Sequence, residues 1–538
     1  MVSQSGALGE AILADATEAG LGVAMFASVG NRVDVTAADL IEYWETDRRI
    51  KVILLYLESF GDPSHFVRVA RRVARKKPII AVKSGRSAAG AAAVGSHTGS
   101  VAGADLAADS LLTQCGVLRV DSFREMFSLA TALLDQPLPR GDRIAVVTNA
   151  GGPGILATDA LVGCGLQMAE LSKSNQTALR RSLPAEASTG NPVDLLASAD
   201  AKRYRAALRA VLRDRGVDAL LVLFVSPVMI DAEAVAEAIV ERAAESSRPV
   251  LACIMGRQGG DEAQDLLVEN GIPVFRYPED AAGTLRLMVR RWRMLARRPG
   301  KLPTFNVRKS AAGRVLKAGA RGDGWLMGAE AEAVLAAYGI PFAESRRVRT
   351  PAAAVAAAGV LGFPVVLKAE APGLLHKSDH LAVSIDLHDE EDLFEAAADL
   401  VGRLRRRFKG MKLLVQRQAP GRLEVLLGMT RDERYGPLFV LGMGGIEVEA
   451  LGDIALRIAP LDDRDPAEMI ASLRGARLFE AFRGEPAVNS KAAQEGLMRL
   501  QQLVRDFPDI EEVEVNPFIL GSRGQPSLAV DARLRVRV

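Results

Sequence analysis

The chain has 538 residues, of which 49% are hydrophobic and 25% are charged, so it is of ordinary globular composition but too long for a single core. The 68 basic and 66 acidic side chains are interspersed and leave a net charge of only +2, which argues against a nucleic-acid partner. Three widely spaced cysteines favour a reducing compartment over a disulfide framework. With no signal peptide and no apolar run of the roughly 18 residues that span a bilayer, we expect a cytoplasmic protein without a membrane partner.

Residues 1–138 predict an α/β domain. The apolar runs Lys51–Leu57 and Pro78–Val82 flank an amphipathic stretch, His65–Lys76, and this is the pattern of a strand–helix–strand unit in a parallel sheet. The basic residues of that stretch alternate with apolar ones at helical spacing and indicate a solvated helix face. A Pro- and Gly-rich break at 135–142 predicts a domain boundary.

Residues 139–298 repeat this pattern and predict a second doubly covered parallel sheet. Its expected strands are Ile144–Thr148, Ala219–Phe224, Pro249–Ile254 and Ile272–Phe275. A basic helix at 284–298 closes the segment, and we interpret the Gly-, Lys- and Arg-rich stretch 299–321 as a linker.

Residues 322–538 differ, because after a helix at 328–338 the strands follow one another with shorter connections. This spacing predicts an α+β domain with antiparallel sheets. The clearest strands are Val365–Ala369, Ala382–Leu387, Lys412–Gln418, Leu423–Met429 and Leu438–Gly442.

Two similar turns open helices in the first two segments. SQSGALG at 3–9 precedes a helix-forming run, and TNAGGPG at 148–154 follows a predicted strand. Backbone N–H groups at a helix N-terminus favour anions, so both turns are candidates for one phosphate, although an ordinary tight turn fits each equally well. The candidate phosphate-binding residues are Ser5, Gly6, Asn149, Gly151 and Gly152.

His97 lies among small polar residues in SHTGS, a setting typical of a loop that meets a ligand. Its imidazole suits a base, a metal ligand or a nucleophile toward phosphorus, and a simple hydrogen-bonding role stays open. Five histidines without a Cys/His cluster argue against a metal. Glu58 ends the run Lys51–Leu57, where ligands gather in parallel sheets; it could orient an imidazole or be a solvated charge.

Candidate Mg²⁺ ligands occur near the C-terminus. Glu514 and Asn516 share one face of a predicted strand, and Asp531 lies on a later strand that could meet them. Hard oxygen ligands suit Mg²⁺ on nucleotide phosphates, although polar residues of an edge strand give the same pattern. Lys368 ends another predicted strand.

Together these motifs resemble those of the NDP-forming acyl-CoA synthetases, relatives of succinyl-CoA ligase, over nearly the whole chain. The matching blocks are SQSGALG, SVGN, ILLYLE, AVKSGRS, SHTGS, TNAGGPG, GNPVD, VVLKAE, LLHKSD, GPLFVLGMGGIEVE and VEVNPF. The resemblance implies two flavodoxin-like ligase domains followed by an ATP-grasp domain. It also implies the reaction acid + CoA + ATP giving acyl-CoA + ADP + phosphate, with Mg²⁺ as cofactor.

The resemblance further implies residue roles. His97 corresponds to the phosphorylated histidine, Glu58 to the carboxylate that holds its ring, and His376 to a second histidine that carries phosphate between distant sites in some members. The positions implied for nucleotide and metal binding are Lys368 at the phosphates, Gln416, Arg417 and Gln418 at the hinge beside the base, and Asn516 and Asp531 at Mg²⁺.

Three departures from the family pattern affect these expectations. The family normally has a Rossmann-like CoA-binding domain before SQSGALG, so we expect that domain to be a separate subunit, truncated or lost. Residues 380–382 stand where paired glycines are common, and Arg417 stands where an acidic residue is common. A non-catalytic acyl-CoA and nucleotide sensor, as in some protein acetyltransferases, and an ATP-grasp ligase without phosphohistidine are the alternatives. A homo-oligomer is expected by analogy only.

Overall fold

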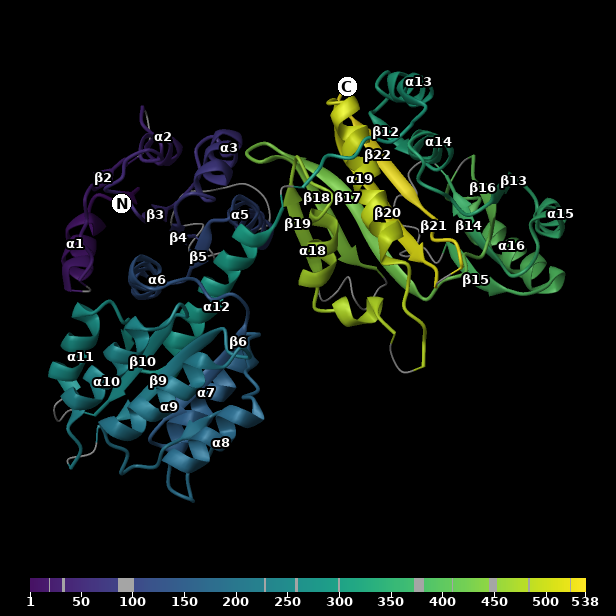
Figure 1. The fold of residues 1–538 in the computed structure, drawn as a ribbon. Coiled ribbons are helices and arrows are strands. Elements are labelled where there is room, and N and C mark those ends of the chain that lie inside the picture. Colours follow the sequence, from purple (N-terminus) through teal and green to yellow (C-terminus); the bar gives the residue numbers. More distant parts are fainter. Residues whose placement is uncertain are drawn as a thin grey trace. The chain divides into compact units, whose positions relative to one another are not determined.

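Figure 1 shows the computed structural model of the chain. It describes all residues except 19, 31–33, 86–100, 227–228, 257–259, 299, 372–381, 409, 445–451, 482–483 and 523, and the side chains of 18 and 101–104. His97 and His376 therefore lie outside the described residues. The chain forms two compact units, Met1–Pro299 and Gly300–Val538.

The first unit begins with a five-stranded parallel sheet in the order β2-β1-β3-β4-β5. Its strands are β1 (Val2–Ser3), β2 (Ala27–Ser28), β3 (Ile53–Leu57), β4 (Ile79–Lys83) and β5 (Leu118–Val120). Its helices are α1 (Leu8–Glu18), α2 (Ala37–Tyr43), α3 (Pro63–Val73), α5 (Val101–Cys115) and α6 (Phe123–Asp135). Because β1 has β2 on one side and β3 on the other, the order reverses between β1 and β3, where flavodoxin-like sheets bind ligands.

The second sheet of this unit is also parallel, with the order β11-β10-β9-β6-β7 and β8 paired to β6. Its strands are β6 (Arg143–Thr148), β7 (Gln167–Met168), β8 (Val193–Asp194), β9 (Ala219–Val225), β10 (Val250–Met255) and β11 (Val274–Phe275). Its helices are α7 (Gly151–Gly163), α8 (Lys173–Ser182), α9 (Ala201–Arg213), α10 (Ala232–Ala244), α11 (Gly260–Glu269) and α12 (Pro278–Ala296). The strand order reverses between β6 and β9. The two predicted parallel sheets are thus confirmed.

The two parallel sheets share one hydrophobic core. Leu54 and Ile80 of the first sheet and Leu221 of the second belong to a single buried cluster that also includes residues of α12. From α12, Arg290 donates to the Thr113 hydroxyl at 2.6 Å. The first two predicted segments therefore fold as one unit.

The basic stretch of α3 is a solvated face, as predicted. Phe66 and Val73 are buried, whereas Arg72 pairs with Glu42 at 2.7 Å and with Glu45 at 2.8 Å. Lys76 likewise pairs with Glu45 at 2.5 Å, so these two charges face neighbouring carboxylates of this domain. Among the helices that the structure describes, none is both long and apolar enough to cross a membrane.

The second unit contains two antiparallel sheets, as the sequence predicts. The larger sheet has the order β12-β22-β20-β17-β18-β19, with β21 paired to β20. Its strands are β12 (Trp325–Met327), β17 (Leu423–Asp432), β18 (Gly436–Met443), β19 (Ile454–Ile458), β20 (Ile510–Leu520), β21 (Leu528–Ala529) and β22 (Ala532–Val536). The smaller has the order β13-β16-β14-β15, with β13 (Ser345–Val348), β14 (Val365–Glu370), β15 (Val383–Leu387) and β16 (Lys412–Arg417). The helices are α13 (Lys309–Gly319), α14 (Ala329–Ala337), α15 (Pro351–Leu361), α16 (Glu390–Leu404), α18 (Asp465–Ser472) and α19 (Ser490–Asp506), with a 3₁₀ turn, η2 (Ala476–Phe479).

The smaller sheet has one face covered by helices. Leu367 and Val415 on that face pack in a core with Ala358 of α15 and Leu400 of α16, and Figure 1 shows these two helices beside the sheet. Since successive residues of a strand point to opposite faces, the other face of the sheet carries the alternate residues of β14 and β16.

Residues 299–321 correct the expectation of a linker. This stretch contains α13, whose Ala312 and Leu316 are buried in the core of the second unit. The sequence pattern was misleading because these two fully buried positions, one helical turn apart, lie between glycines, lysines and arginines.

Candidate active site

The turn after β1 lies at the switch point of the first sheet. The Ser3 hydroxyl donates to the Ser5 carbonyl at 2.7 Å and accepts from the Ser5 N–H at 3.1 Å. The Ser5 N–H is therefore engaged within the turn. Gly6 follows as an exposed residue just before α1, so its backbone N–H is better placed than that of Ser5 for an anion.

The Gln4 side chain extends the hydrogen bonding between β1 and β3 beyond the end of β1. Its side-chain oxygen accepts from the N–H groups of Glu58 at 2.6 Å and Ser59 at 3.0 Å, and its side-chain nitrogen donates to the Ser59 carbonyl at 2.8 Å. Gln4 is only 6% exposed. Sequence reasoning missed this residue because a glutamine in a small polar turn carries no sign of its partners.

The turn after β6 has the same construction at the switch point of the second sheet. The Thr148 hydroxyl donates to the Ala150 carbonyl at 2.9 Å and accepts from its N–H at 3.0 Å. The Asn149 amide donates to the Val225 carbonyl at 2.8 Å and accepts from the Val225 N–H at 2.9 Å. Both polar atoms of the Asn149 side chain thus join β6 to β9. An anion bound at this position would therefore contact the backbone of Asn149 and not its side chain.

Gly151 and Gly152 are exposed at the start of α7. The residue before them, Ala150, makes no side-chain capping hydrogen bond, so the first N–H groups of α7 are not capped by that residue. An uncapped helix N-terminus with small residues is a suitable anion site. The structure thus keeps Gly6, Gly151 and Gly152 as the stronger phosphate-binding candidates.

Glu58 lies directly after β3 at the first switch point and is partly buried. Its backbone is fixed by Gln4 at 2.6 Å, whereas among the described residues its carboxylate makes no hydrogen bond or ion pair. The neighbouring strand β4 ends at Lys83, and Ser84 still bonds the Leu57 carbonyl at 3.0 Å. The stretch 86–100, which contains His97, follows in sequence from this strand end.

Lys368 lies in β14 on the face of the smaller sheet opposite to the one that packs against α15 and α16. It is 6% exposed, and its ammonium donates to the Val530 carbonyl at 2.7 Å, which links the two sheets of this unit. On the same face, the Arg347 guanidinium binds Glu370 at 2.8 Å and Glu332 at 3.0 Å. Burial lowers the Arg347 pKa, but these two carboxylates outweigh it and hold the pKa above its usual value. The positive charge of Arg347 is therefore balanced by these two carboxylates. The buried ammonium of Lys368 is held at the Val530 carbonyl.

Gln416 shares this face, because it pairs with Val366, two residues from Lys368 on β14. It is 1% exposed, and neither polar atom of its amide has a hydrogen-bond partner among the described residues. A buried amide without partners costs free energy unless a ligand satisfies it. The donor and acceptor of Gln416 therefore fit a polar ligand edge such as that of a nucleotide base.

The other two predicted hinge residues differ from Gln416. The Arg417 side chain is exposed, and its N–H donates to the Glu344 carbonyl at 2.8 Å. The Gln418 amide donates to the Asp386 carboxylate at 2.6 Å and accepts from the Asp386 N–H at 3.2 Å. Gln416 is thus the buried member of the three, and within the described part of the protein its amide makes no hydrogen bond.

Asn516 lies in β20, whereas Asp531 directly precedes β22, the strand that pairs with β20, instead of lying on a strand. The Asn516 N–H donates to the Asp531 carbonyl at 3.2 Å, in register with the pairing of Val515 and Ala532. Directly opposed residues project from the same face of a sheet. Asp531 also follows Val530, whose carbonyl holds Lys368. Two oxygen-bearing side chains beside a lysine suit a Mg²⁺ ion that takes its other ligands from phosphates and water.

Glu514 is bound to other side chains. It pairs with Arg533 at 2.5 Å and accepts from the Asn516 amide at 3.1 Å. Because a carboxylate can only accept from the NH₂ of that amide, the Asn516 oxygen is directed away from Glu514. The contacts of Glu514 orient Asn516, which assigns Glu514 a supporting role beside the predicted ligands.

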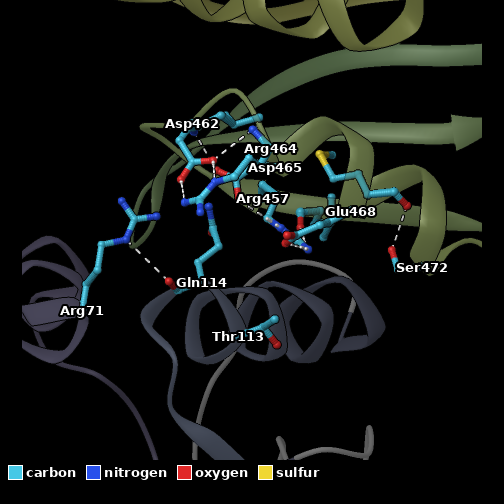
Figure 2. Close-up of polar contacts among 12 residues, drawn as sticks. Arg71, Thr113, Gln114, Arg457, Asp462, Arg464, Asp465, Glu468 and Ser472 are labelled. Atoms are coloured by element: carbon cyan, nitrogen blue, oxygen red, sulfur yellow. Dashed lines mark hydrogen bonds and ion pairs between the residues drawn. The ribbon is translucent and has the colours of Figure 1, made fainter. Parts of the chain in front are cut away.

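A separate charged cluster lies at the start of α18 (Figure 2). Arg464 binds Asp462 at 2.6 Å, and Arg457 lies 3.8 Å from Asp465 and 3.9 Å from Glu468. Acidic residues in the first turn of a helix are stabilised by its dipole. The carboxylates are therefore accounted for by arginines and a helix end. No group of three or more His, Cys, Asp and Glu in the described parts of the chain could hold a metal ion.

Comparisons with known domain families cover both units. Residues 1–133 match the succinyl-CoA ligase like flavodoxin domain, residues 144–299 the Ligase-CoA domain, and residues 317–536 the ATP-grasp domain. The fold and the site therefore define a ligase built from two flavodoxin-like domains and an ATP-grasp domain.

Related proteins make this class more specific. The chain is 34% identical over 542 residues to the 4-hydroxybutyrate–CoA ligase (ADP-forming) of Nitrosopumilus maritimus, covering 99% of this chain and 77% of the relative. It is 34% identical over 521 residues to acetate–CoA ligase (ADP-forming) I of Archaeoglobus fulgidus, covering 96% and 75%. The chain belongs to the NDP-forming acid–CoA ligases, the family that its motifs resemble.

A solved structure agrees with this assignment. The dinucleotide forming acetyl-coenzyme A synthetase 1 of Candidatus Korarchaeum cryptofilum, in complex with phosphate and ADP, is 33% identical with a TM-score of 0.52. The match covers 55% of this chain and 64% of that chain, so this chain spans somewhat less than two thirds of its length.

Proposed function

We propose that this chain carries out the phosphoryl-transfer steps of acid + CoA + ATP giving acyl-CoA + ADP + phosphate, with His97 as the phosphate carrier. The observation that carries the proposal is the position of Glu58. Its carboxylate is unpaired among the described residues, and its backbone is fixed at a switch point, beside the strand end that leads in sequence to His97. A carboxylate there can accept a hydrogen bond from the N–H of one imidazole nitrogen and leave the other nitrogen as the nucleophile.

The proposed chemistry divides one transfer into two in-line displacements. An imidazole nitrogen of His97 attacks the γ-phosphorus of ATP, the bond to the bridging oxygen breaks, and ADP leaves. A carboxylate oxygen of the acid then attacks the phosphorus, so that the N–P bond breaks and an acyl phosphate forms. The CoA sulfur attacks the acyl carbon and releases phosphate.

The backbone N–H groups at Gly6, Gly151 and Gly152 would hold the phosphorylated imidazole. Helix N-termini stabilise an anion by about 0.3–1 kcal/mol each when exposed and up to ~2 kcal/mol when partly buried. Such binding is strong enough to orient the phosphate and weak enough to release it.

In the nucleotide site, Lys368 would bind the phosphates, Gln416 the base, and Asn516 with Asp531 the metal. Mg²⁺ supplies charge neutralisation at the phosphates when bound. The support is the common location of these groups on the two sheets and the buried, unpaired amide of Gln416. His376 is proposed as a second carrier between the two sites.

The sensor alternative is not favoured, because the two relatives described above, which match nearly the whole chain, are ADP-forming CoA ligases. It makes a different prediction, namely nucleotide binding without covalent phosphate.

The test is incubation with γ-³²P-labelled ATP and Mg²⁺, followed by acid and base treatment of the denatured chain. We expect acid-labile, base-stable label that is lost in His97→Ala. A His376→Ala variant should retain nucleotide binding and label His97 slowly. Undiminished label in His97→Ala would overturn the carrier role, and label at the normal rate in His376→Ala would remove the relay.

A further inference from the structure

The hydrogen bonds of Gln4 have a specific structural consequence for Glu58. Backbone pairing between β1 and β3 ends near Gln4, whose own N–H donates to the Tyr56 carbonyl at 3.2 Å. Beyond this point the Gln4 side chain takes the place of backbone, bonding Glu58 once and Ser59 twice. A carboxamide can do this because it carries the same donor and acceptor as a peptide group.

The second sheet uses the same arrangement without a carboxylate at its end. Asn149 bonds both backbone groups of Val225 on β9, and the next residue is Ser226. Ser3-Gln4-Ser5 and Thr148-Asn149-Ala150 thus build equivalent turns from different residues. Only the first of these turns fixes the backbone of a residue with a carboxylate.

We infer that Gln4 is a positioning residue that acts on phosphoryl transfer through Glu58. This inference rests on the proposed function, because it assumes that Glu58 assists a phosphorylated histidine. The Gln4 oxygen holds the Glu58 N–H at 2.6 Å, so the backbone that sets the direction of the carboxylate is fixed from a different strand. Without Gln4, the N–H groups of Glu58 and Ser59 lose their acceptor, and the end of β3 is freed to move.

The test is a double-mutant cycle on the rate of labelling by γ-³²P-labelled ATP, measured by rapid quench. Gln4→Met keeps the size of the side chain and removes its hydrogen bonds, and Glu58→Gln removes the carboxylate charge. A displacement of about 1 Å costs up to roughly 100-fold in rate, so we expect Gln4→Met to slow labelling by about 10- to 100-fold. In the Glu58→Gln background, Gln4→Met should slow labelling by less than about 2-fold, because coupled residues do not act additively.

Asn149→Leu is the matched control, since it removes an equivalent strand-joining amide from the second sheet. Its effect on labelling should multiply with that of Glu58→Gln, as for independent sites. Nucleotide affinity, measured by titration calorimetry with ADP and Mg²⁺, should be unchanged in Gln4→Met. If Gln4→Met does not fold, Gln4→Asn, which withdraws the amide by one methylene, takes its place in the cycle.

The outcomes separate this inference from the proposed function. If the wild type is labelled but the effects of Gln4→Met and Glu58→Gln on the labelling rate multiply, the role of Gln4 is overturned. The role of His97 as the phosphate carrier then still holds. Wild-type labelling rates in Gln4→Met also overturn it. Absence of label in the wild type, or its persistence in His97→Ala, overturns the proposed function and the inference with it.

Discussion

Replacing Gln416 by Met should separate nucleotide affinity from stability. Gln416 is 1% exposed and its amide nitrogen and oxygen lack partners among the described residues, so an apolar side chain of similar size should be neutral or stabilising without nucleotide. If both atoms bind the base, the variant loses two hydrogen bonds of about 0.5–1.5 kcal/mol each. The dissociation constant for ADP should therefore rise by about 5- to 150-fold.

Gln502→Met is the control for this experiment. Gln502 is 4% exposed in the same unit, but its amide accepts from the Phe305 N–H at 2.7 Å and donates to the Phe305 carbonyl at 3.0 Å. Its loss should cost about 1–3 kcal/mol of stability and leave ADP affinity unchanged. Calorimetric unfolding and ADP titration of both variants measure the two quantities. The assignment of Gln416 to the base would be refuted if Gln416→Met were as destabilised as Gln502→Met and its ADP affinity were unchanged.

Three further predictions concern charged groups. Lys368→Met should weaken ADP binding by about 10-fold or more, because the variant lacks the cation beside the phosphates; unchanged titration would exclude this lysine from the site. Asp531→Asn should raise the Mg²⁺ concentration needed for half-maximal labelling, and an unchanged Mg²⁺ dependence would remove Asp531 from the ligand set. Burial raises the Asp218 pKa, but the hydrogen bonds from Arg143 at 2.8 and 2.9 Å outweigh it and leave the pKa below its usual value. Stability from this pair is therefore present above pH about 4 and lost as pH falls through the lowered pKa. Urea unfolding should show Asp218→Asn to be less stable than the wild type at neutral pH and the difference to shrink in acid, and a difference independent of pH would contradict the pairing.

The sequence was sufficient to predict β3, β4, β6, β9, β10 and β11, because these buried parallel strands are continuous apolar runs. Lys51–Leu57 and Ala219–Phe224 differ from the observed β3 and β9 by one or two residues at their ends. β1 was not predicted, since a strand of two residues, Val2–Ser3, has no detectable period. The helix α13 was missed for a similar reason, because only two of its residues, Ala312 and Leu316, are fully buried.

The candidate site was predictable where strand alternation determines which residues meet. The spacing of Glu514 and Asn516 predicted a shared face, and the structure places Asp531 opposite Asn516. Hydrogen-bond partners could not be predicted in this way. Gln418 bonds Asp386 and Asn149 bonds Val225, and each partner is determined by strand packing between positions distant in sequence. The difference between the paired amide of Gln418 and the unpaired amide of Gln416 became visible only in the fold.

We propose that a histidine of the first unit passes phosphate to and from the nucleotide site of the second. The most direct measurement is a single-turnover experiment in which the labelled, nucleotide-free chain is mixed with ADP and Mg²⁺ and quenched at successive times. The account predicts that label leaves the protein and appears as ATP with matching rates, without added CoA or acid. Label that stays on the protein, or that appears only as inorganic phosphate while ADP is unchanged, would contradict it.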